Sequence, residues 1–271
     1  MNHKVFIVPH DFTPVADVAL NHALATAKIV NARIYLLHVV NKAKEIEEAE
    51  AKLNKIIEKL DTTIDIVPTA RVGSIFEDIG DFASEHHAEL IFMGTHGIKG
   101  WQNITGSRAL KVVAHSDVPF IVVQQGKEIG ASGYDSIVVP LDLNKETKQK
   151  LGYVANLANY FNSHVHVVIP DETDDIFRAQ IKVNIKFAQK FFSERNVNYD
   201  ISFLNPNNFE KEVLKHAESI NADLITIMNL HKSNIISNLV SNPEEYLLTN
   251  EANIPILILN PERRISSFSL G

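Results

Sequence analysis

Short apolar runs alternate along this chain with longer segments in which apolar residues recur every three or four positions. In the first half of the sequence the apolar runs fall at residues 5–8, 34–40, 63–70, 90–94 and 119–123. They lack polar alternation, so they predict strands that are buried on both faces. Such strands separated by helices are typical of a parallel sheet covered on both sides, which is a doubly wound α/β domain.

The segments between these runs carry helical patterns. Apolar spacing predicts helices over residues 14–30 and 41–60. A third helix is expected over residues 74–87, where Ser74 as N-cap and Glu77 would form a capping box. A fourth is expected at about residues 106–115. Doubly wound folds bind ligands beyond the carboxyl ends of their strands, so we expect a site in the loops that follow the strands.

The sequence repeats itself. The matching segments are KVFIVPHDF with DSIVVPLDL, residues 84–94 with 218–228, and residues 118–123 with 254–259. The first pair aligns Pro9 with Pro140 and Asp11 with Asp142, an offset of 131 residues that drifts to 134 and 136 in the later pairs. A slow drift reflects small loop insertions between two copies of one domain. We predict domains at residues 1–125 and 134–262, joined by a flexible, glycine-containing linker of about ten residues.

Composition excludes several classes of function. The 271 residues include 26 Lys and Arg against 33 Asp and Glu, a net charge of −7, so the chain lacks the positive field that non-specific nucleic-acid binding needs. The absence of cysteine excludes disulfides, thiolate catalysis and Cys-ligated zinc. Only four consecutive apolar residues precede Pro9, and no run reaches the roughly 18 apolar residues of a membrane helix. We expect a cytoplasmic protein without nucleic-acid or membrane partners.

A glycine-rich stretch follows the fourth apolar run. Within the sequence MGTHGIKGWQNITGSRALKVV, 13 residues hold 4 of the chain's 11 glycines, namely Gly94, Gly97, Gly100 and Gly106. Glycines let backbone N–H groups approach a ligand, and Gly106-Ser107 opens a predicted helix whose free N–H groups favour phosphate. The stretch is neither a GxxxxGK[ST] P-loop nor a GxGxxG fingerprint. It predicts a phosphate-binding loop of another kind, with plain turn geometry as the alternative.

These residues resemble the universal stress protein family. The matching pieces are VPHDF at 8–12, LLHVV at 36–40, the MGTHG loop and residues 106–123. Members that bind ATP carry G-x2-G, nine residues and G-[ST], and here eight residues separate Gly97 from Gly106-Ser107. The resemblance implies two tandem doubly wound, parallel five-stranded sheets of the adenine nucleotide alpha hydrolase-like fold, related by a pseudo-twofold axis. It also implies ATP as the ligand, with or without Mg²⁺.

The resemblance further implies roles for single residues. Asp11 and Val39 would contact adenine and ribose, and Pro9 would shape the base pocket. The ribose and phosphates would be bordered or held by Met93, Gly94, His96, Gly97, Gly106, Ser107 and Arg108. Two alternatives remain open: Asp11 as a turn carboxylate after the first strand, and His96 as a solvent-facing loop histidine.

The second copy has lost this pattern. In the alignment, the replacements are Gly94 by Met228, Gly97 by His231, and Gly106-Ser107 by Asn242-Pro243. Side chains therefore stand where backbone would approach phosphate, and proline has no N–H to donate. We expect nucleotide in the first domain alone, with the second domain as a pairing or regulatory partner.

Histidines offer a weaker candidate. His164 and His166 face the same side of a predicted strand, a spacing that can bind metal, but no carboxylate stands at a characteristic spacing from them, so no metal site is predicted. His10 and His38 lie near the proposed pocket, and structural roles are expected for them. The chain has no GxSxG, HExxH or paired-carboxylate motif, so no catalytic residue is predicted.

The sequence thus favours a stress-response protein that binds ATP in its first domain and has a regulatory or signalling role. The alternatives are a nucleotide-independent interaction or dimerisation module, and a slow ATP hydrolase that relies on electrostatic stabilisation alone. The closing apolar runs, residues 118–123 and 254–259, would leave exposed sheet edges. Because the linker raises their effective concentration to roughly millimolar, we predict intramolecular pairing of these two strands. Dimerisation of whole chains is left open.

Overall fold

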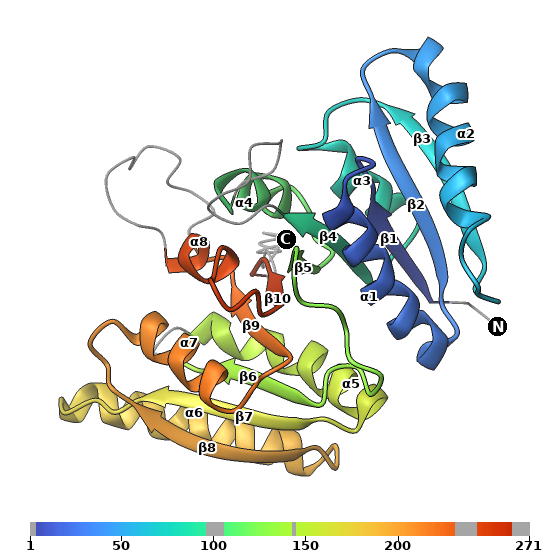
Figure 1. The fold of residues 1–271 in the computed structure, drawn as a ribbon. Helices are drawn as coiled ribbons and strands as arrows, with labels where there is room; N and C mark the ends of the chain where they lie inside the picture. Colours follow the sequence, from blue (N-terminus) through green and yellow to red (C-terminus); the bar gives the residue numbers. More distant parts are fainter. Residues whose placement is uncertain (1–3, 96–105, 143–144, 231–242, 262–271) are drawn as a thin grey trace, which may run out of the picture.

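The strands of the protein form one open sheet, seen in a computed structural model that describes residues 4–95, 106–142, 145–230 and 243–261. The sheet has ten strands in the order β3-β2-β1-β4-β5-β10-β9-β6-β7-β8 (Figure 1). Neighbouring strands are parallel everywhere except at the central pair, β5 and β10, which is antiparallel. The predicted fold class, a doubly wound and mostly parallel α/β sheet, is confirmed.

The first half of the chain alternates strands and helices as its hydrophobic pattern predicts. Its elements are β1 (Val5–Pro9), α1 (Pro14–Val30), β2 (Arg33–Val40), the 3-10 turn η1 (Ala43–Glu45), α2 (Ile46–Ile57), β3 (Ile66–Val72), α3 (Asp78–Glu85), β4 (Leu90–Thr95), α4 (Gly106–Ala114) and β5 (Phe120–Gln124).

The second half follows the same plan. Its elements are β6 (Ser136–Pro140), the 3-10 segment η2 (Lys145–Lys150), α5 (Leu151–Phe161), β7 (His164–Pro170), α6 (Asp175–Ser193), β8 (Asn198–Leu204), α7 (Phe209–Ser219), β9 (Leu224–Met228), α8 (Pro243–Leu248) and β10 (Ile256–Leu259). Pairing starts at Val5↔Arg33 in the first half and at Ser136↔His164 in the second, so the sequence offset of 131 recurs in the strand register.

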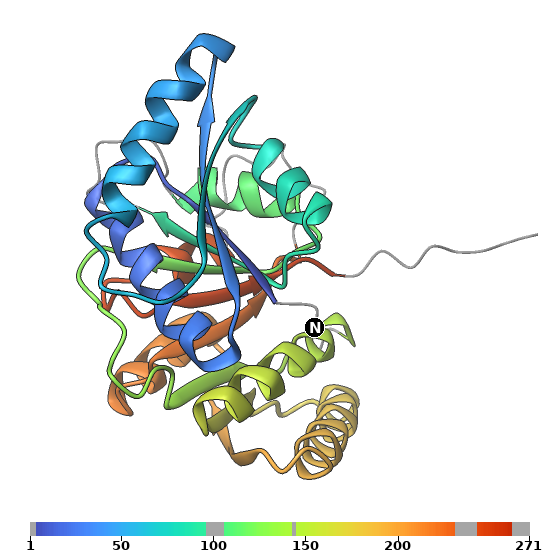
Figure 2. The same cartoon turned by 90° about the vertical axis from the view of Figure 1, so that its right-hand side faces the viewer.

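Helices cover both faces of the sheet, and each face has its own core. One core joins alternate strand residues such as Phe6 and Leu36 to α1, α2, α5 and α6. The other joins the intervening residues, such as Ile7 and Leu37, to α3, α4, α7 and α8. Figure 2 shows this layering in the first half, with the blue α1 and α2 on one side of the strands and the teal α3 and green α4 on the other. No helix among the described residues is long and apolar enough to cross a membrane.

The predicted capping box before the third helix is wrong. Helix α3 begins at Asp78, four residues later than expected, and Glu77 makes no side-chain cap. The reason is that the Asp78 side chain points toward the residues that precede the helix. Its Oδ2 accepts the Ser74 N–H at 2.7 Å, and its Oδ1 accepts the Arg71 Nε–H at 2.9 Å. Ser74 Oγ instead accepts the Phe76 N–H, which forms a turn rather than a helical cap. The predicted helix over residues 41–60 is likewise shorter, because residues 43–45 form a 3-10 turn.

The two closing strands meet at the centre of the sheet. β5 and β10 pair through Phe120↔Ile258, Ile121↔Leu257 and Val122↔Ile256. The strand order on one side of this pair is repeated in reverse on the other, as a twofold axis at the junction would produce.

The linker between the halves is packed, which corrects the expectation of a flexible tether. Tyr134 is 1% exposed, and its hydroxyl contacts the buried His22 of α1 at 2.8 Å. Lys127 of the linker donates to the Ala222 carbonyl at 2.6 Å, and its own carbonyl lies 3.2 Å from His22 Nε2, so the linker contacts both halves. Gly133 takes φ +88°, and a side chain there would collide with the Phe161 ring.

Candidate functional site

The carboxyl ends of β1, β2 and β4 define the candidate site. β1 lies between β2 and β4, so the connection from β1 leads to one side of it and the connection from β3 to β4 leads to the other. This is the switch in strand order at which open α/β sheets bind ligands. Since the three strands are parallel neighbours, Pro9, Val39 and Gly94 all lie toward one edge of the sheet.

A buried histidine organises the loop after β1. His10 is 2% exposed, and its Nδ1 accepts the Phe12 N–H at 3.1 Å. Its Nε2 then carries the proton and donates to Asp17 Oδ1 at 3.1 Å. Burial lowers the pKa of His10, against the raising effect of Asp17, which favours the neutral ring that these contacts require. His38 Nδ1 donates to the His10 carbonyl at 2.7 Å, so both histidines have the structural roles expected of them.

Asp11 is exposed and serves as a turn carboxylate. Its Oδ1 accepts the Thr13 N–H at 3.2 Å and the Thr13 hydroxyl at 2.5 Å, immediately before α1. This geometry matches the structural alternative given for Asp11. It leaves the carboxylate facing solvent at the carboxyl ends of the strands, where the family resemblance implies a ribose.

Two residues at this edge were missed by the sequence analysis. Phe12 adopts φ 65° and is 36% exposed, and its ring lies 4.5 Å from the His38 ring. Lys52 of α2 places its ammonium 5.7 Å from the centre of the Phe12 ring. An exposed aromatic ring with a cation beside it can stack on a base and attract a phosphate. Phe12 stands within the VPHDF segment, whereas Lys52 has no local signal because α2 is brought to the edge only by folding.

Met93 and Gly94 are placed by packing at the end of β4. Met93 is 1% exposed, and its side chain packs into the core under α3 and α4. A Cβ added to Gly94 would lie 2.5 Å from the Val15 carbonyl oxygen, so the first turn of α1 crosses β4 only because this residue is glycine. The Gly94 backbone, one residue before the end of β4, therefore lies directly beside the start of α1.

The start of α4 supplies the remaining described positions. Gly106 is the first residue of α4, and Ser107 and Arg108 are exposed in its first turn. Backbone N–H groups in a first helical turn favour an anion. His96 and Gly97 lie outside the described residues, as does the whole stretch 96–105.

The second half is built differently at the equivalent edge. Glu244, aligned with Arg108, is 7% exposed in α8, and its Oε1 accepts the Leu230 N–H at 3.2 Å. Asn229, aligned with Thr95, donates from Nδ2 to Asn260 Oδ1 at 2.9 Å. The chain's own polar groups thus pair with Asn229 and Leu230, the two described residues that directly follow β9.

A buried lysine also distinguishes the second half. Lys150, at the end of η2, is 2% exposed, and burial lowers its pKa to about 8 against the raising effect of Asp142. Asp142 aligns with Asp11. In the first half, the family resemblance makes Asp11 a ribose contact. In the second half, the aligned Asp142 lies close enough to the buried Lys150 to raise the pKa of that lysine.

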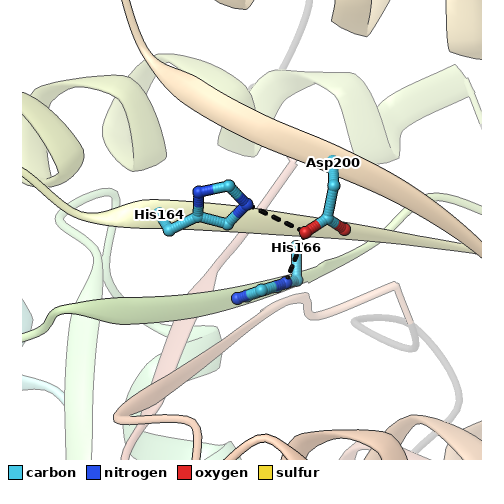
Figure 3. Close-up of side chains that lie close together, drawn as sticks. All are labelled: His164, His166 and Asp200. Atoms are coloured by element: carbon cyan, nitrogen blue, oxygen red, sulfur yellow. Dashed lines mark hydrogen bonds and ion pairs between the residues drawn. The ribbon is translucent and has the colours of Figure 1, made fainter.

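His164 and His166 have a carboxylate partner that their sequence spacing did not indicate. Asp200 on the neighbouring strand β8 contacts both imidazoles, each at 2.8 Å (Figure 3). No spacing rule could have found it, because the carboxylate comes from a different strand. The strand register His166↔Asp200 is the signal that places it.

Comparison with known proteins agrees with the fold and with the motifs of the first half. Residues 2–124 match the model of the Universal stress protein family. A universal stress protein of Methanocaldococcus jannaschii is 28% identical over 146 residues, covering 46% of this chain and 85% of the relative, and a second from that organism is 26% identical over 155 residues, covering 45% and 96%. Among solved structures, a universal stress protein from Archaeoglobus fulgidus aligns with a TM-score of 0.75 at 16% identity, covering 97% of this chain and 100% of its own.

The fold and this edge define a doubly wound α/β protein with a candidate anion-binding switch point. The first half of the chain matches the universal stress protein family, the same family that the sequence motifs indicated. The second half shares the fold through the full-length structural likeness.

Proposed function

We propose that this chain is a stress-response protein whose first half binds an adenine nucleotide, ATP, at the carboxyl edge of β1, β2 and β4. The second half binds none and has a regulatory or pairing role. The observation that carries the proposal is the reversal of charge at one aligned position, Arg108 in α4 against Glu244 in α8.

Glu244 supports this difference between the halves because its side chain already fills the place where a phosphate would have to bind. It accepts the Leu230 N–H that follows β9 and belongs to the first turn of α8. A phosphate at that place would have to displace the buried Glu244 side chain from the Leu230 N–H, which is unfavourable. At the aligned place in the first half stands an exposed arginine, whose charge favours phosphate.

The first-half residues suit the parts of ATP in distinct ways. Asp11, Pro9 and Val39 would border ribose and base, and the exposed Phe12 ring offers a stacking surface. Gly106 and Ser107 would hold phosphate at the start of α4, together with His96 and Gly97. Asp11 in the loop after β1 and Asp17 in the first turn of α1 already bond to Thr13 and His10, so Mg²⁺ would be held chiefly by phosphates and water.

Calorimetric titration of the full chain with ATP, ADP, AMP and cyclic AMP tests this proposal. We expect about one adenine-nucleotide site per chain. Two equivalent sites, or no binding by a folded protein, would contradict it. Phosphate release measured in the same samples decides between a nucleotide-binding protein and the slow hydrolase that the sequence left as an alternative.

The pairing of the two halves is the second candidate role. We propose domains at 1–125 and 134–262 that pair within one chain through β5 and β10, with three register positions and the packed linker as support. Sedimentation equilibrium then measures whether whole chains dimerise further. A cross-linking map that separates β5 from β10 would contradict the pairing. The cytoplasmic location stays a prediction.

A further inference from the structure

Two imidazoles and a carboxylate converge near the amino ends of β7 and β8, at the opposite end of these strands from their carboxyl ends. His164 is the first residue of β7, His166 lies two residues on, and Asp200 faces them from the edge strand β8. His164 Nε2 and His166 Nδ1 each lie 2.8 Å from Asp200 Oδ2, and all three ligand atoms lie within 4.8 Å of one another (Figure 3).

The cluster lies on the sheet face that α7 covers. His216 of α7 places its ring 6.3 Å from the His166 ring. The Nε2 atom of His216 is buried and has no hydrogen-bond partner within the described part of the chain. Buried imidazole nitrogens rarely lack a hydrogen-bond partner, and a polar or charged species bound beside His216 would explain this one.

The internal repeat provides a comparison within the same chain. The strand register and the alignment place Arg33, Tyr35, Val67 and Phe82 where the second half has His164, His166, Asp200 and His216. In the first half Tyr35 and Phe82 form an edge-to-face aromatic pair at 5.6 Å, and Arg33 pairs with Asp65 at 2.6 Å. The first half thus uses these positions for packing and a surface ion pair, whereas the second half has an imidazole or a carboxylate at all four.

We propose that His164, His166 and Asp200 bind a divalent transition-metal ion of the Zn²⁺ type. Imidazole nitrogen and carboxylate oxygen are ligands that Zn²⁺, Co²⁺ and Ni²⁺ accept, and three protein ligands leave a position for water. Tetrahedral bonds of about 2.0–2.1 Å would set the ligand atoms roughly 3.3 Å apart. The two 2.8 Å contacts must lengthen by about 0.5 Å to admit the ion, a shift within the reach of side-chain rotations on the exposed His164 and Asp200.

Such an ion would fasten the edge strand β8 to β7. β8 has a neighbour on one side only, so its backbone is the more easily detached. Ligands from both strands would join it to the interior of the sheet, and a ligand that binds only the folded state stabilises that state. The ion is independent of the nucleotide, because its ligands lie in the other half of the chain.

Metal titration of the chelator-treated full chain, without nucleotide, tests the site. We expect one Zn²⁺ per chain by calorimetry, a rise in the unfolding temperature with Zn²⁺, and visible absorption from bound Co²⁺ typical of nitrogen and oxygen ligands. His164→Gln and Asp200→Asn each remove one ligand at an exposed position and should weaken Zn²⁺ binding by at least about 100-fold. His115→Gln, at an exposed histidine in the first half, is the matched control and should leave the affinity unchanged.

Two results would overturn the proposal. One is the absence of stoichiometric Zn²⁺ binding by the folded wild-type chain. The other is equal affinity in wild type, His164→Gln and Asp200→Asn, because the ion would then be held by other histidines.

Discussion

His22 and Tyr134 join the linker to the first helix through a buried hydrogen bond. His22 Nδ1 and the Tyr134 hydroxyl oxygen lie 2.8 Å apart, and both side chains are 1% exposed. His22 Nε2 lies 3.2 Å from the Lys127 carbonyl, so Nε2 donates there and Nδ1 accepts from Tyr134. Both contacts run from α1 to the segment that leads into the second half.

Tyr134→Phe should lower the free energy of unfolding by about 1–3 kcal/mol, because it leaves Nδ1 of His22 buried without a donor. Denaturant unfolding of the full chain measures the change. In a double-mutant cycle with His22→Phe, the two losses should be clearly less than additive. Additive losses would mean that the two groups do not act through this contact.

Acidification should destabilise the chain through His22. Burial lowers the pKa of His22 below its ordinary 6.5, against the raising effects of the hydrogen bond to the Lys127 carbonyl and of the Glu128 charge. Between the two pKa values the unfolded chain binds more protons, so stability is full above about pH 6.5 and decreases as the pH falls below it. His22→Gln should flatten this decrease between pH 7.5 and pH 5. His10 contributes a residual slope of the same sign, since burial lowers its pKa too.

Lys150 should produce a second rise of stability with pH, at alkaline pH. Its pKa is lowered from 10.5 to about 8 by burial, so between these pH values the unfolded chain binds the extra proton and stability rises with pH. Lys150→Met removes this rise, and the difference in unfolding free energy between variant and wild type should shrink by on the order of 3 kcal/mol from pH 8 to pH 10.5. Lys182→Met, at an exposed lysine of α6, is the control and should leave the pH profile unchanged.

The charge at α4 should decide nucleotide affinity. Arg108→Glu gives the first half the acidic residue of the second and should weaken ATP binding by at least about tenfold, since a charge-assisted contact contributes about 1.5–3 kcal/mol. Lys111→Glu makes the same charge change one turn later on the same helix, at an exposed site, and should have a much smaller effect. Equal losses in the two variants would indicate a general field rather than a phosphate contact.

Gly94 should be intolerant of any side chain. In Gly94→Ala the new Cβ would lie 2.5 Å from the Val15 carbonyl oxygen, and overpacking of this kind costs about 1–3 kcal/mol. Gly152 in α5 has open space around its Cβ position, so Gly152→Ala should instead stabilise the chain by up to about 1 kcal/mol. Thermal unfolding of both variants gives the comparison. Equal effects would refute the close approach of α1 to β4.

The repeat, the strand positions and the family of the first half could be predicted from the sequence. Apolar runs and helical spacing report burial that neighbouring residues share, so β1 and α1 fall where the pattern places them. The offset between Pro9 and Pro140 recurs in the strand register because both copies pair their strands in the same way. Helix ends were less predictable, since Asp78, and not Glu77, accepts the Ser74 N–H.

Only the tertiary structure decided which distant groups meet. Asp200 reaches His164 and His166 because β8 pairs with β7 in one register, and a shift of one residue would turn it to the other face. Gly94 is constrained by Val15 across the α1–β4 contact. Lys150 becomes buried only when η2 packs against β9. Local periodicity specifies which side of an element is buried, whereas the pairing of strands and the packing of helices determine what each buried or facing group contacts.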